Sequence, residues 1–389
     1  MKRQGTGIFA NGLIWFGAAV SVAEIETGIQ SGNNWTALIL GHLLGGALLF
    51  AVGLIGAKAR LNAMDSTASA FGTNGAKFFA LLNLLQLVGW TSVMIAQGAD
   101  ALGGLNLPLN GTLLSIGLAA LVAVWIFVGL KDSAHIATVA MTLLAILVAI
   151  LTFKLLGSAQ SVPGESAGKL SFWAAFELSV AMPLSWLPLV SDYTKNAERP
   201  FAATATSAAV YTVTSIWMYA IGILIGLFGE GATLSTAILS VGLGIPGILI
   251  VVFSTVTTTF LDAYSAGESA KTIFGKLNPK IVGVVVCAIG VVLSATGFID
   301  RYTDFLYLIA SVFAPMAAVF AISHYVVKRT LPVWNLVSWA FGFVVYNWFA
   351  GNSPIGPTMT AMAVSAVLAL AGKLARLPAP GGQGLGGRE

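Results

Sequence analysis

Charged residues are scarce in this chain. Only 9% of its 389 residues are Asp, Glu, Lys or Arg, whereas 57% are hydrophobic. A soluble domain carries about 25% charged residues, so this composition excludes an ordinary water-soluble protein. Apolar stretches long enough to cross a bilayer, which takes roughly 20 residues, recur along the chain. The sequence therefore predicts an all-α, polytopic membrane protein.

Residues that hold metals or act in catalysis are also few. The single cysteine, Cys287, excludes an intrachain disulfide, and three histidines are too few for a histidine-based metal site. The sequence contains no Walker loop, dinucleotide-binding loop, Ser/His/Asp arrangement or His-Glu-x-x-His motif. We therefore expect neither an enzyme nor a nucleotide-driven pump, and no cofactor or obligate protein partner.

Charges and clusters of Pro, Gly and Asn divide the chain into twelve predicted spans. They cover residues 6–29, 34–57, 78–102, 112–130, 134–156, 170–194, 201–228, 245–268, 280–298, 303–327, 332–350 and 355–375. No small-residue cleavage site follows the first apolar run, so we expect a retained helix there, not a signal peptide. The Gly/Pro-rich stretch 377–389 is expected to be disordered.

The positions of the lysines and arginines predict an orientation. With the N-terminus in the cytoplasm, all of them lie on the cytoplasmic side except Lys154, Lys169 and Arg301. Cytoplasmic loops of membrane proteins carry an excess of positive charge, so we expect both termini in the cytoplasm. The formal net charge of +4 then reflects membrane topology, and we expect no nucleic-acid partner.

The number of spans predicts an internal repeat. Five spans precede the sixth, so the sixth enters the membrane from the side opposite to the first. If spans one to five (1–157) and six to ten (165–329) are two copies of one unit, the copies are inverted, as in many secondary transporters. The last two spans (330–376) lie outside this repeat.

Two spans carry interruptions at mid-membrane depth. The first contains Ser21 and Glu24 in the polar run SVAEIETG, and the sixth contains Pro183 in the run SVAMPLS. A proline inside a helix frees a backbone carbonyl, which must meet protein, water or ligand. A simple kink explains Pro183 alone equally well. Its pairing with the first-span interruption favours a binding site between two discontinuous helices.

Four acidic residues, Glu24, Glu26, Glu177 and Asp262, lie inside apolar spans. An isolated carboxylate in hydrocarbon is costly and normally faces a polar cavity or a partner. We therefore predict that Glu24, Glu177 and Asp262 bind substrate or carry a proton. Glu26 would point about 200° away from Glu24 on a regular helix. Asp192 ends the sixth span and is expected to be a gate or structural residue.

The third span carries a polar and aromatic face. Gln86, Trp90 and Gln97 are spaced at i, i+4 and i+11, which places them on one side of a helix. A tryptophan ring offers a stacking surface, and an amide both donates and accepts hydrogen bonds. This face suits a flat polar ring, although ordinary packing between helices would also explain Trp90 by itself.

The eighth span concentrates hydroxyl groups. Ser254, Thr257 and Thr258 lie at i, i+3 and i+4, on one helical face. Together with carbonyls freed from the interrupted first span, they predict an all-oxygen site for a small cation. A threonine in a membrane helix often bonds its own i−4 carbonyl instead. Coupling by a proton, through Glu24, Glu26 or Asp262, is the alternative.

These residues resemble the nucleobase:cation symporter-1 family, which includes bacterial cytosine and hydantoin transporters. The resemblance covers spans one to ten. It is most specific in four runs, namely GAAVS to TG (17–28), VGW (88–90), WLPLVSDYTK (186–195) and TTT to YSAG (257–267). It implies a LeuT-like inverted repeat of five and five helices plus two C-terminal helices, in a bacterial cytoplasmic membrane.

The resemblance also implies positions for the ligands. A sodium site would lie between the first and eighth helices, on Ser254, Thr257 and Thr258 with the backbone carbonyls of Ser21 and Glu24. Trp90 would stack on the substrate ring. Substrate positions on the sixth helix would fall on Met182 and Pro183, where the aromatic that covers the ring in the family is replaced.

Within the family the chain most resembles the CytX-type group, to which uptake of hydroxymethylpyrimidine, a thiamine precursor, is assigned. This resemblance lies in the runs AEI (23–25) and SWLP (185–188). We therefore expect a symporter for a pyrimidine-type ring, driven by Na⁺ or H⁺. A permease for cytosine or another nucleobase, and an amine transporter on the same scaffold, are the alternatives.

Overall fold

Regular structure in the described part of the chain is helical, apart from one isolated bridge between Thr6 and Ala197. This confirms the all-α prediction. The stretch 377–389, predicted to be disordered, lies outside the described residues. The computed structural model describes residues 5–105, 107–132, 134–159, 170–228, 231–350 and 355–374.

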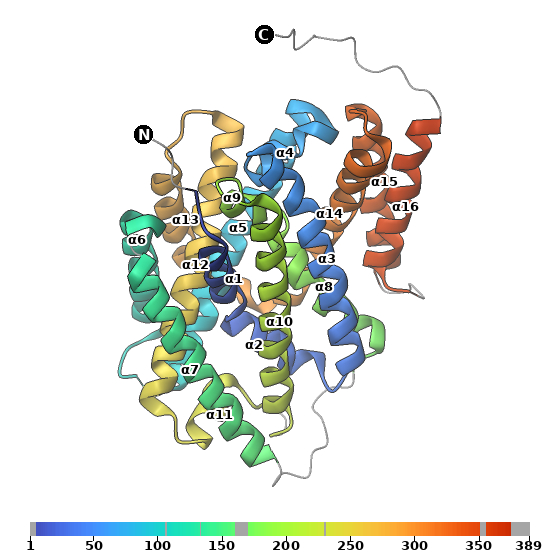
Figure 1. Ribbon diagram of the computed structural model, residues 1–389. Helices are drawn as coiled ribbons and strands as arrows, with labels where there is room; N and C mark the ends of the chain where they lie inside the picture. Colours follow the sequence, from blue (N-terminus) through green and yellow to red (C-terminus); the bar gives the residue numbers. More distant parts are fainter. Residues whose placement is uncertain are drawn as a thin grey trace.

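The helices form one bundle of long rods that run up and down the molecule (Figure 1). Each predicted span overlaps one helix or consecutive helices. In chain order the helices are α1 (Ile8–Ala19), α2 (Val22–Ser31), α3 (Trp35–Ala59), α4 (Ala63–Ser66), α5 (Ala68–Gly104), α6 (Gly111–Asp132), α7 (Ala134–Ala159), α8 (Phe172–Trp186), α9 (Val190–Thr194), α10 (Pro200–Gly226), α11 (Leu234–Ser240), α12 (Gly244–Phe274), α13 (Pro279–Ser294), η1 (Phe298–Arg301), α14 (Tyr302–Ile322), η2 (Ser323–Val327), α15 (Pro332–Phe349) and α16 (Pro357–Leu374).

Eight helices within the described residues are long and apolar enough to cross a membrane, or nine if the bent pair α1 and α2 forms one span. The predicted total of twelve spans stays a prediction, because α8, α13 and α15 are not among these helices. α8 and α13 have only 15 and 16 residues. The third span starts earlier than expected. α5 begins at Ala68 and bends at Gly72, whose φ of +69° favours glycine.

The first span is broken as predicted. α1 ends at Ala19 and α2 begins at Val22, and the two helices are bent by 53°. Ser21 is the N-cap of α2, and its hydroxyl accepts a hydrogen bond from the N–H of Glu24 at 3.2 Å. A serine in this position satisfies a helix-end donor, so the break has a local cause in the sequence.

The sixth span is also broken, but the predicted position was wrong. α8 continues through Pro183 to Trp186, and the chain leaves the helix only over residues 187–189, before α9. The ring of Pro183 packs against Gly45 of α3, where an added Cβ would lie 2.6 Å from the proline Cγ. Pro188, which lacks an N–H, stands in the break instead.

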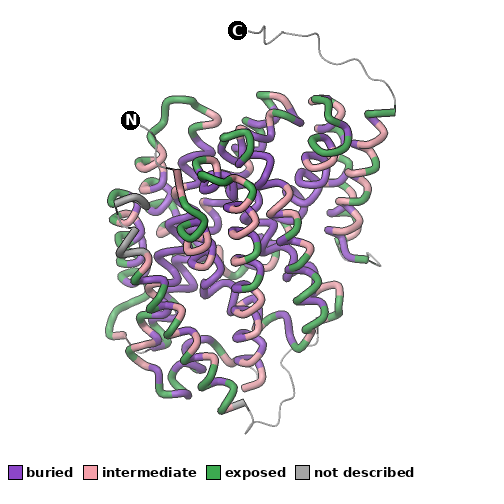
Figure 2. The backbone as a smooth tube through the Cα atoms, viewed as in Figure 1, coloured by how far each residue is buried: buried purple, intermediate pink, exposed green. Residues whose placement is uncertain are grey.

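Burial separates the inside of the bundle from its outer surface. Figure 2 shows buried backbone along the central helices and exposed segments on the periphery, notably on α6 and α7. The exposed side chains there are large and apolar, as in Val124, Phe127 and Phe153. A lipid-facing surface is apolar in this way, so the burial pattern agrees with a membrane location.

Candidate functional site

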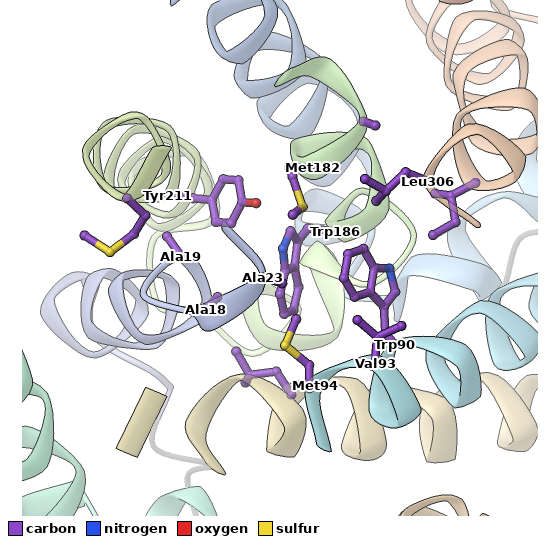
Figure 3. Packing of buried hydrophobic residues seen from close by; sticks show 14 of the residues in the cluster. Ala18, Ala19, Ala23, Trp90, Val93, Met94, Met182, Trp186, Tyr211 and Leu306 are labelled. Carbon is purple, nitrogen blue, oxygen red and sulfur yellow. The ribbon is translucent and has the colours of Figure 1, made fainter. Parts of the chain in front are cut away.

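Large side chains gather where the α1–α2 break faces the end of α8. Figure 3 shows Trp186, the last residue of α8, together with Met182, Met94 and Trp90 beside this break. All four are buried. Trp186 also meets Trp15 of α1 edge-on, with ring centroids 5.7 Å apart. The middle of the bundle therefore holds a cluster of aromatic and thioether side chains, which suits contact with a flat apolar ring.

Trp90 is held in place by aromatic residues of α14. Its ring centroid lies 5.5 Å from that of Phe305 and 6.0 Å from that of Tyr302. Gly89 leaves room for this packing, since an added Cβ would lie 2.7 Å from the Phe305 ring. The indole Nε1 of Trp90 is buried and has no acceptor in the described part of the chain. Such a donor is costly unless it is satisfied.

Gln86 lies one helical turn before Trp90 and is bonded on one side only. Its Nε2 donates to the carbonyl of Ser185 at 3.0 Å and to Oδ1 of Asn83 at 2.7 Å. Its Oε1 is buried and receives no hydrogen bond from the described residues. The same is true of Oε1 of Gln97. The predicted polar face of α5 therefore presents one unused donor and two unused acceptors.

Glu24 is fully engaged within the protein. It is 1% exposed. Its Oε1 accepts from the hydroxyl of Tyr211 at 2.6 Å, and its Oε2 accepts from Ser215 at 2.7 Å, both on α10. Ser215 in turn lies 2.8 Å from Nε2 of His42 on α3. Because both oxygens of Glu24 already have donors, the predicted direct contact with substrate is not supported.

Glu177 does not face the break. Its Oε2 accepts from the hydroxyl of Thr358 at 2.5 Å, and its Oε1 accepts from the N–H of Thr358 at 3.1 Å. Thr358 lies in the first turn of α16, where free N–H groups attract a carboxylate. These contacts give Glu177 a structural role at the start of α16 and do not support the prediction that it binds substrate. The packing of the Pro183 ring against α3 likewise gives no support to its predicted substrate contact.

The predicted hydroxyl cluster adjoins α1. Thr258 donates to the carbonyl of Gly17 at 3.1 Å. The hydroxyls of Thr257 and Ser254 return to carbonyls of their own helix. The first-helix carbonyl that meets this cluster is thus that of Gly17. The predicted partners differ, since the carbonyl of Ser21 accepts from the N–H of Ile25 at 3.4 Å inside the start of α2.

Asp262 is buried on α12 at 2% exposure. Its Oδ2 has no hydrogen-bond donor among the described residues. The hydroxyl of Thr259, one turn earlier, also has no hydrogen-bond partner among them. A buried carboxyl oxygen without a donor is costly in a membrane. Asp262 therefore keeps its predicted assignment as a residue that meets a ligand or a proton.

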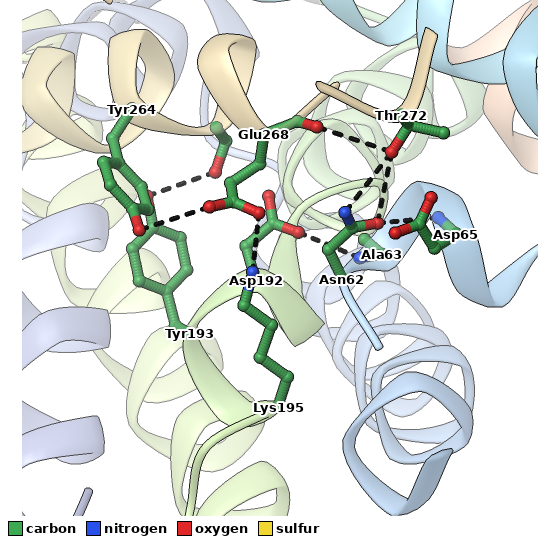
Figure 4. Close-up of polar contacts among 10 residues, drawn as sticks. Asn62, Ala63, Asp65, Asp192, Tyr193, Lys195, Tyr264, Glu268 and Thr272 are labelled. Carbon is green, nitrogen blue, oxygen red and sulfur yellow. Dashed lines mark hydrogen bonds and ion pairs between the residues drawn. The ribbon is translucent and has the colours of Figure 1, made fainter. Parts of the chain in front are cut away.

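Asp192 belongs to a polar network at the end of the bundle where α9 lies (Figure 4). Its Oδ1 accepts from the N–H of Ala63 at 2.9 Å, which ties α9 to α4. Beside it, Lys195 forms an ion pair with Glu268 of α12 at 2.6 Å. A surface hollow of about 720 Å³ opens over this ion pair and is lined in part by Arg60. The network joins the end of the broken sixth span to α12, as a gate would require.

Comparison with known proteins agrees with this architecture. The family model for permeases of cytosine/purines, uracil, thiamine and allantoin matches residues 6–378. The chain belongs to this permease family, the nucleobase:cation symporter-1 family. The cytosine permease of Escherichia coli (strain K12) is 23% identical over 371 residues, which cover 90% of this chain and 86% of the permease. The family members are transporters and not enzymes, which confirms that prediction.

Solved structures give the same fold. Mhp1, a nucleobase-cation-symport-1 family transporter in a closed conformation with bromovinylhydantoin bound, has a TM-score of 0.76 at 18% identity, covering 96% of this chain and 94% of Mhp1. A Na⁺-coupled sialic acid symporter in a substrate-bound outward-open state has a TM-score of 0.73 at 13% identity, covering 97% of this chain and 91% of the symporter. The chain is an integral membrane transporter with the LeuT-like fold.

Sequence reasoning missed several residues of this region. Trp186 is the clearest case. In the sequence it belongs to a run that resembles the family, but nothing there predicted that its ring lies beside the α1–α2 break. Tyr211 and Ser215 lie in an apolar span with no unusual pattern. His42 lies in the apolar second span, where no pattern sets it apart either. Only the contact between α2, α3 and α10 brings the last three together, so no signal in one span could have identified them.

Proposed function

We propose that this family member imports a small, flat, neutral heterocycle by alternating access, and that the heterocycle is an aminopyrimidine. The observation that carries this proposal is the α5 face, where the stacking ring and unused donor of Trp90 stand one turn from the unused acceptor of Gln86. An aminopyrimidine offers ring nitrogens as acceptors and an exocyclic amine as donor. Hydroxymethylpyrimidine, expected for the CytX-type group, has this pattern.

Trp186 supports the same proposal. The family's covering aromatic is replaced near Pro183, and Trp186 stands one turn further along the same helix, where it faces the break together with Met182. We propose that Trp90 and Trp186 contact the two faces or edges of the ring. Ser21 and Asp262 complete the proposed substrate region, Ser21 at the break and Asp262 as a buried polar group on α12.

Cytosine is the second candidate substrate, because a cytosine permease is among the relatives. It carries the same exocyclic amine next to a ring nitrogen, and it adds a carbonyl oxygen. An amine substrate has less support, since Glu24 and Glu177 are both occupied by donors from the protein. We further propose that the chain resides in a bacterial inner membrane with both termini in the cytoplasm.

A cation would couple to this transport. We propose a sodium site on Thr258, Thr257 and Ser254, completed by the carbonyl of Gly17, because hydroxyl and carbonyl oxygens suit a hard cation. The Thr258 hydroxyl already lies against that carbonyl. Sodium bound there would connect α12 to α1 near the end of α1. It would therefore favour one arrangement of α1 relative to α12 over another.

The test is uptake of radiolabelled hydroxymethylpyrimidine, cytosine and uracil into proteoliposomes, with sodium or choline outside. We expect the two aminopyrimidines to be taken up in preference to uracil. A Gln86→Leu variant removes the free acceptor and should lose more uptake of aminopyrimidines than of uracil. An equal loss of uptake for aminopyrimidines and uracil would mean that Gln86 has a structural role, through its hydrogen bond to the carbonyl of Ser185. Preferential uptake of uracil by the wild type would refute the aminopyrimidine assignment.

A further inference from the structure

A buried chain of hydrogen bonds crosses three helices beside the break. Nδ1 of His42 lies 2.9 Å from the carbonyl of Leu38, Nε2 of His42 lies 2.8 Å from Oγ of Ser215, and the same Oγ lies 2.7 Å from Oε2 of Glu24. His42 and Ser215 are 0% exposed, and Glu24 is 1% exposed. We call His42, Ser215 and Glu24 the buried triad. All three side chains of the triad therefore lie inside the bundle.

The number of hydrogens in the triad follows from these three contacts. A carbonyl only accepts, so Nδ1 of His42 must carry a hydrogen. The two contacts of Ser215 each need a hydrogen as well, which makes three. A neutral histidine and a serine supply only two, and an ionised Glu24 supplies none. The triad therefore holds one additional proton, either on Glu24 or as the second proton of His42.

Both placements of that proton leave the triad with no net charge. If the proton is on Glu24, Glu24 donates to Ser215 and Ser215 donates to His42. If it is on His42, both donation directions reverse and an ion pair is bridged by Ser215. Loss of the proton would break one of the two links and leave a buried negative charge, which is costly inside a membrane.

No lysine or arginine within the described residues compensates that charge. The ionisable groups that interact with Glu24 from neighbouring helices are the hydroxyls of Tyr211 and Tyr219 on α10 and Tyr302 on α14. Glu26 lies on the same helix as Glu24 but interacts with Leu234 and Asp100. The surroundings therefore favour a triad that stays neutral by keeping its proton.

The triad is connected to the substrate region through direct contacts. Glu24 follows the break, and its N–H is held by Ser21. Tyr211, which donates to Glu24, has its ring 6.1 Å from that of Trp186, and Figure 3 shows it beside the break. A change in the protonation of Glu24 would thus reach both the N-cap of α2 and an aromatic residue of the site.

We propose that the buried triad is the proton-binding site of this transporter, and that one proton bound there accompanies the substrate. The proton joins Glu24 and His42 when the site faces one side of the membrane and leaves when it faces the other. This assignment rests on the proposed function of the chain as a symporter. The proton site is separate from the hydroxyl cluster of α12, so the triad binds its proton with or without sodium.

The first test needs no substrate. Above about pH 7 an unfolded chain has an ionised glutamate and a neutral histidine, so unfolding releases the proton of the triad and folding becomes less favourable by about tenfold per pH unit. The melting temperature of the purified wild type should therefore fall as the pH rises above neutral. In Glu24→Gln the amide donates to Ser215 without an ionisable proton, so its melting temperature should change much less with pH.

Glu177→Gln is the matched control. Glu177 is also a buried glutamate with two hydrogen bonds, but both come from Thr358 as donor, so its contacts need no additional proton. This variant should keep the pH dependence of the wild type. If the melting temperature falls with pH equally in wild type and Glu24→Gln, the triad does not titrate and the proposal is refuted. If Glu24→Gln and Glu177→Gln lose this pH dependence equally, the pH dependence does not come from the triad.

The second test asks whether this proton is coupled to transport. Proteoliposomes with acidic medium outside are given radiolabelled hydroxymethylpyrimidine or cytosine. Wild type should accumulate the substrate, whereas Glu24→Gln should exchange substrate across the membrane but lose accumulation driven by the pH gradient. Undiminished accumulation by Glu24→Gln would overturn the proposal. If wild type exchanges neither pyrimidine, the proposed substrate class is wrong, and the melting temperatures still decide whether the triad holds a proton.

Discussion

Polar side chains in the middle of the bundle differ in whether their hydrogen-bonding atoms are already used. Glu24 and Glu177 each have both carboxyl oxygens in hydrogen bonds with the protein. Trp90, Gln86 and Asp262 keep buried atoms that no described residue satisfies. Since an unsatisfied buried group is costly, we propose the second set as ligand positions and the first set as structural or proton-binding positions.

Replacing Trp90 with alanine should weaken substrate binding by about 1–3 kcal/mol, the range found for base stacking on an aromatic side chain. The loss arises because the substrate ring would lose its stacking surface on α5. Trp90→Phe keeps a ring but removes the free Nε1 donor, so it should cost less than alanine. Affinity is measured by binding of radiolabelled hydroxymethylpyrimidine to purified protein. Unchanged affinity in Trp90→Ala would remove Trp90 from the site.

Glu177→Ala should destabilise the protein by about 1–3 kcal/mol, the cost of leaving a buried donor unsatisfied. The N–H and hydroxyl of Thr358 at the start of α16 would lose their acceptor. Substrate affinity should stay at the wild-type value, because Glu177 faces α16 and not the break. Thermal unfolding checks stability, and Glu198→Ala, at an exposed position, is the control. A loss of affinity without a loss of stability would contradict this assignment.

Close packing of the helices depends on particular glycines. α2 crosses α10 at Gly28 and Gly222, where an added Cβ would lie 2.5 Å from the carbonyl oxygen of Tyr219 and 2.1 Å from that of Ile25, respectively. α3 crosses α8 at Gly41 and Gly45 in the same manner. Small residues permit such backbone approach in membranes. At the α2–α10 crossing, this approach brings Glu24 within reach of its donors on α10.

Gly222→Ala should therefore destabilise the fold by about 1–3 kcal/mol, as overpacking does elsewhere. It should also disturb the contacts of Glu24, because the added methyl pushes α2 away from α10. Gly226→Ala is the matched control on the same helix, since its Cβ would lie 3.7 Å from the nearest atom. Thermal unfolding of the two variants makes the comparison, and equal melting temperatures would contradict the crossing described here.

Thr258→Val should abolish the mutual strengthening of sodium and substrate binding, if sodium binds between α12 and α1. Linkage requires that substrate tighten sodium binding by the same factor as sodium tightens substrate binding. Thr255→Val is the control, because Thr255 faces Gly98 of α5. Substrate titrations in sodium and in choline measure the effect. If the affinity of the wild type for substrate is the same in sodium and in choline, this sodium site is excluded.

The two ends of the molecule differ in charge. The end that carries α4 and α9 also carries Lys195, Lys271 and Lys276, and α16 finishes there with Lys373 (Figure 1). The opposite end carries Arg301 in η1. Positive charge is retained on the cytoplasmic side, so we predict that the end with the Lys195–Glu268 ion pair faces the cytoplasm.

This orientation can be tested with single cysteines in a Cys287→Ser background. Lys276→Cys and Arg301→Cys replace exposed residues that precede and follow α13, a helix predicted to cross the membrane. In intact cells a membrane-impermeant maleimide should label the cysteine at 301 and leave that at 276 unlabelled until the membrane is opened. The reverse labelling would invert the orientation.

The sequence by itself determined the membrane location, the helical class, the family and the break at Ser21. These depend on composition, span length and local capping, which act within a few neighbouring residues. The resemblance to the family depends on short runs of the same kind. Trp90 and Gln86 were also predictable as one face of a helix, because helical periodicity places them without reference to any other helix.

Tertiary structure decided what each buried polar residue contacts. Glu24, Glu177 and Asp262 looked equivalent in the sequence, since each is an acid in an apolar span. Only the packing of α2 on α10, and of α8 on α16, gave the first two their donors, whereas Oδ2 of Asp262 has no donor among the described residues. The cost of a buried charge depends on such partners, and helices far apart in the chain supply them, so their identity could not be read from any single span.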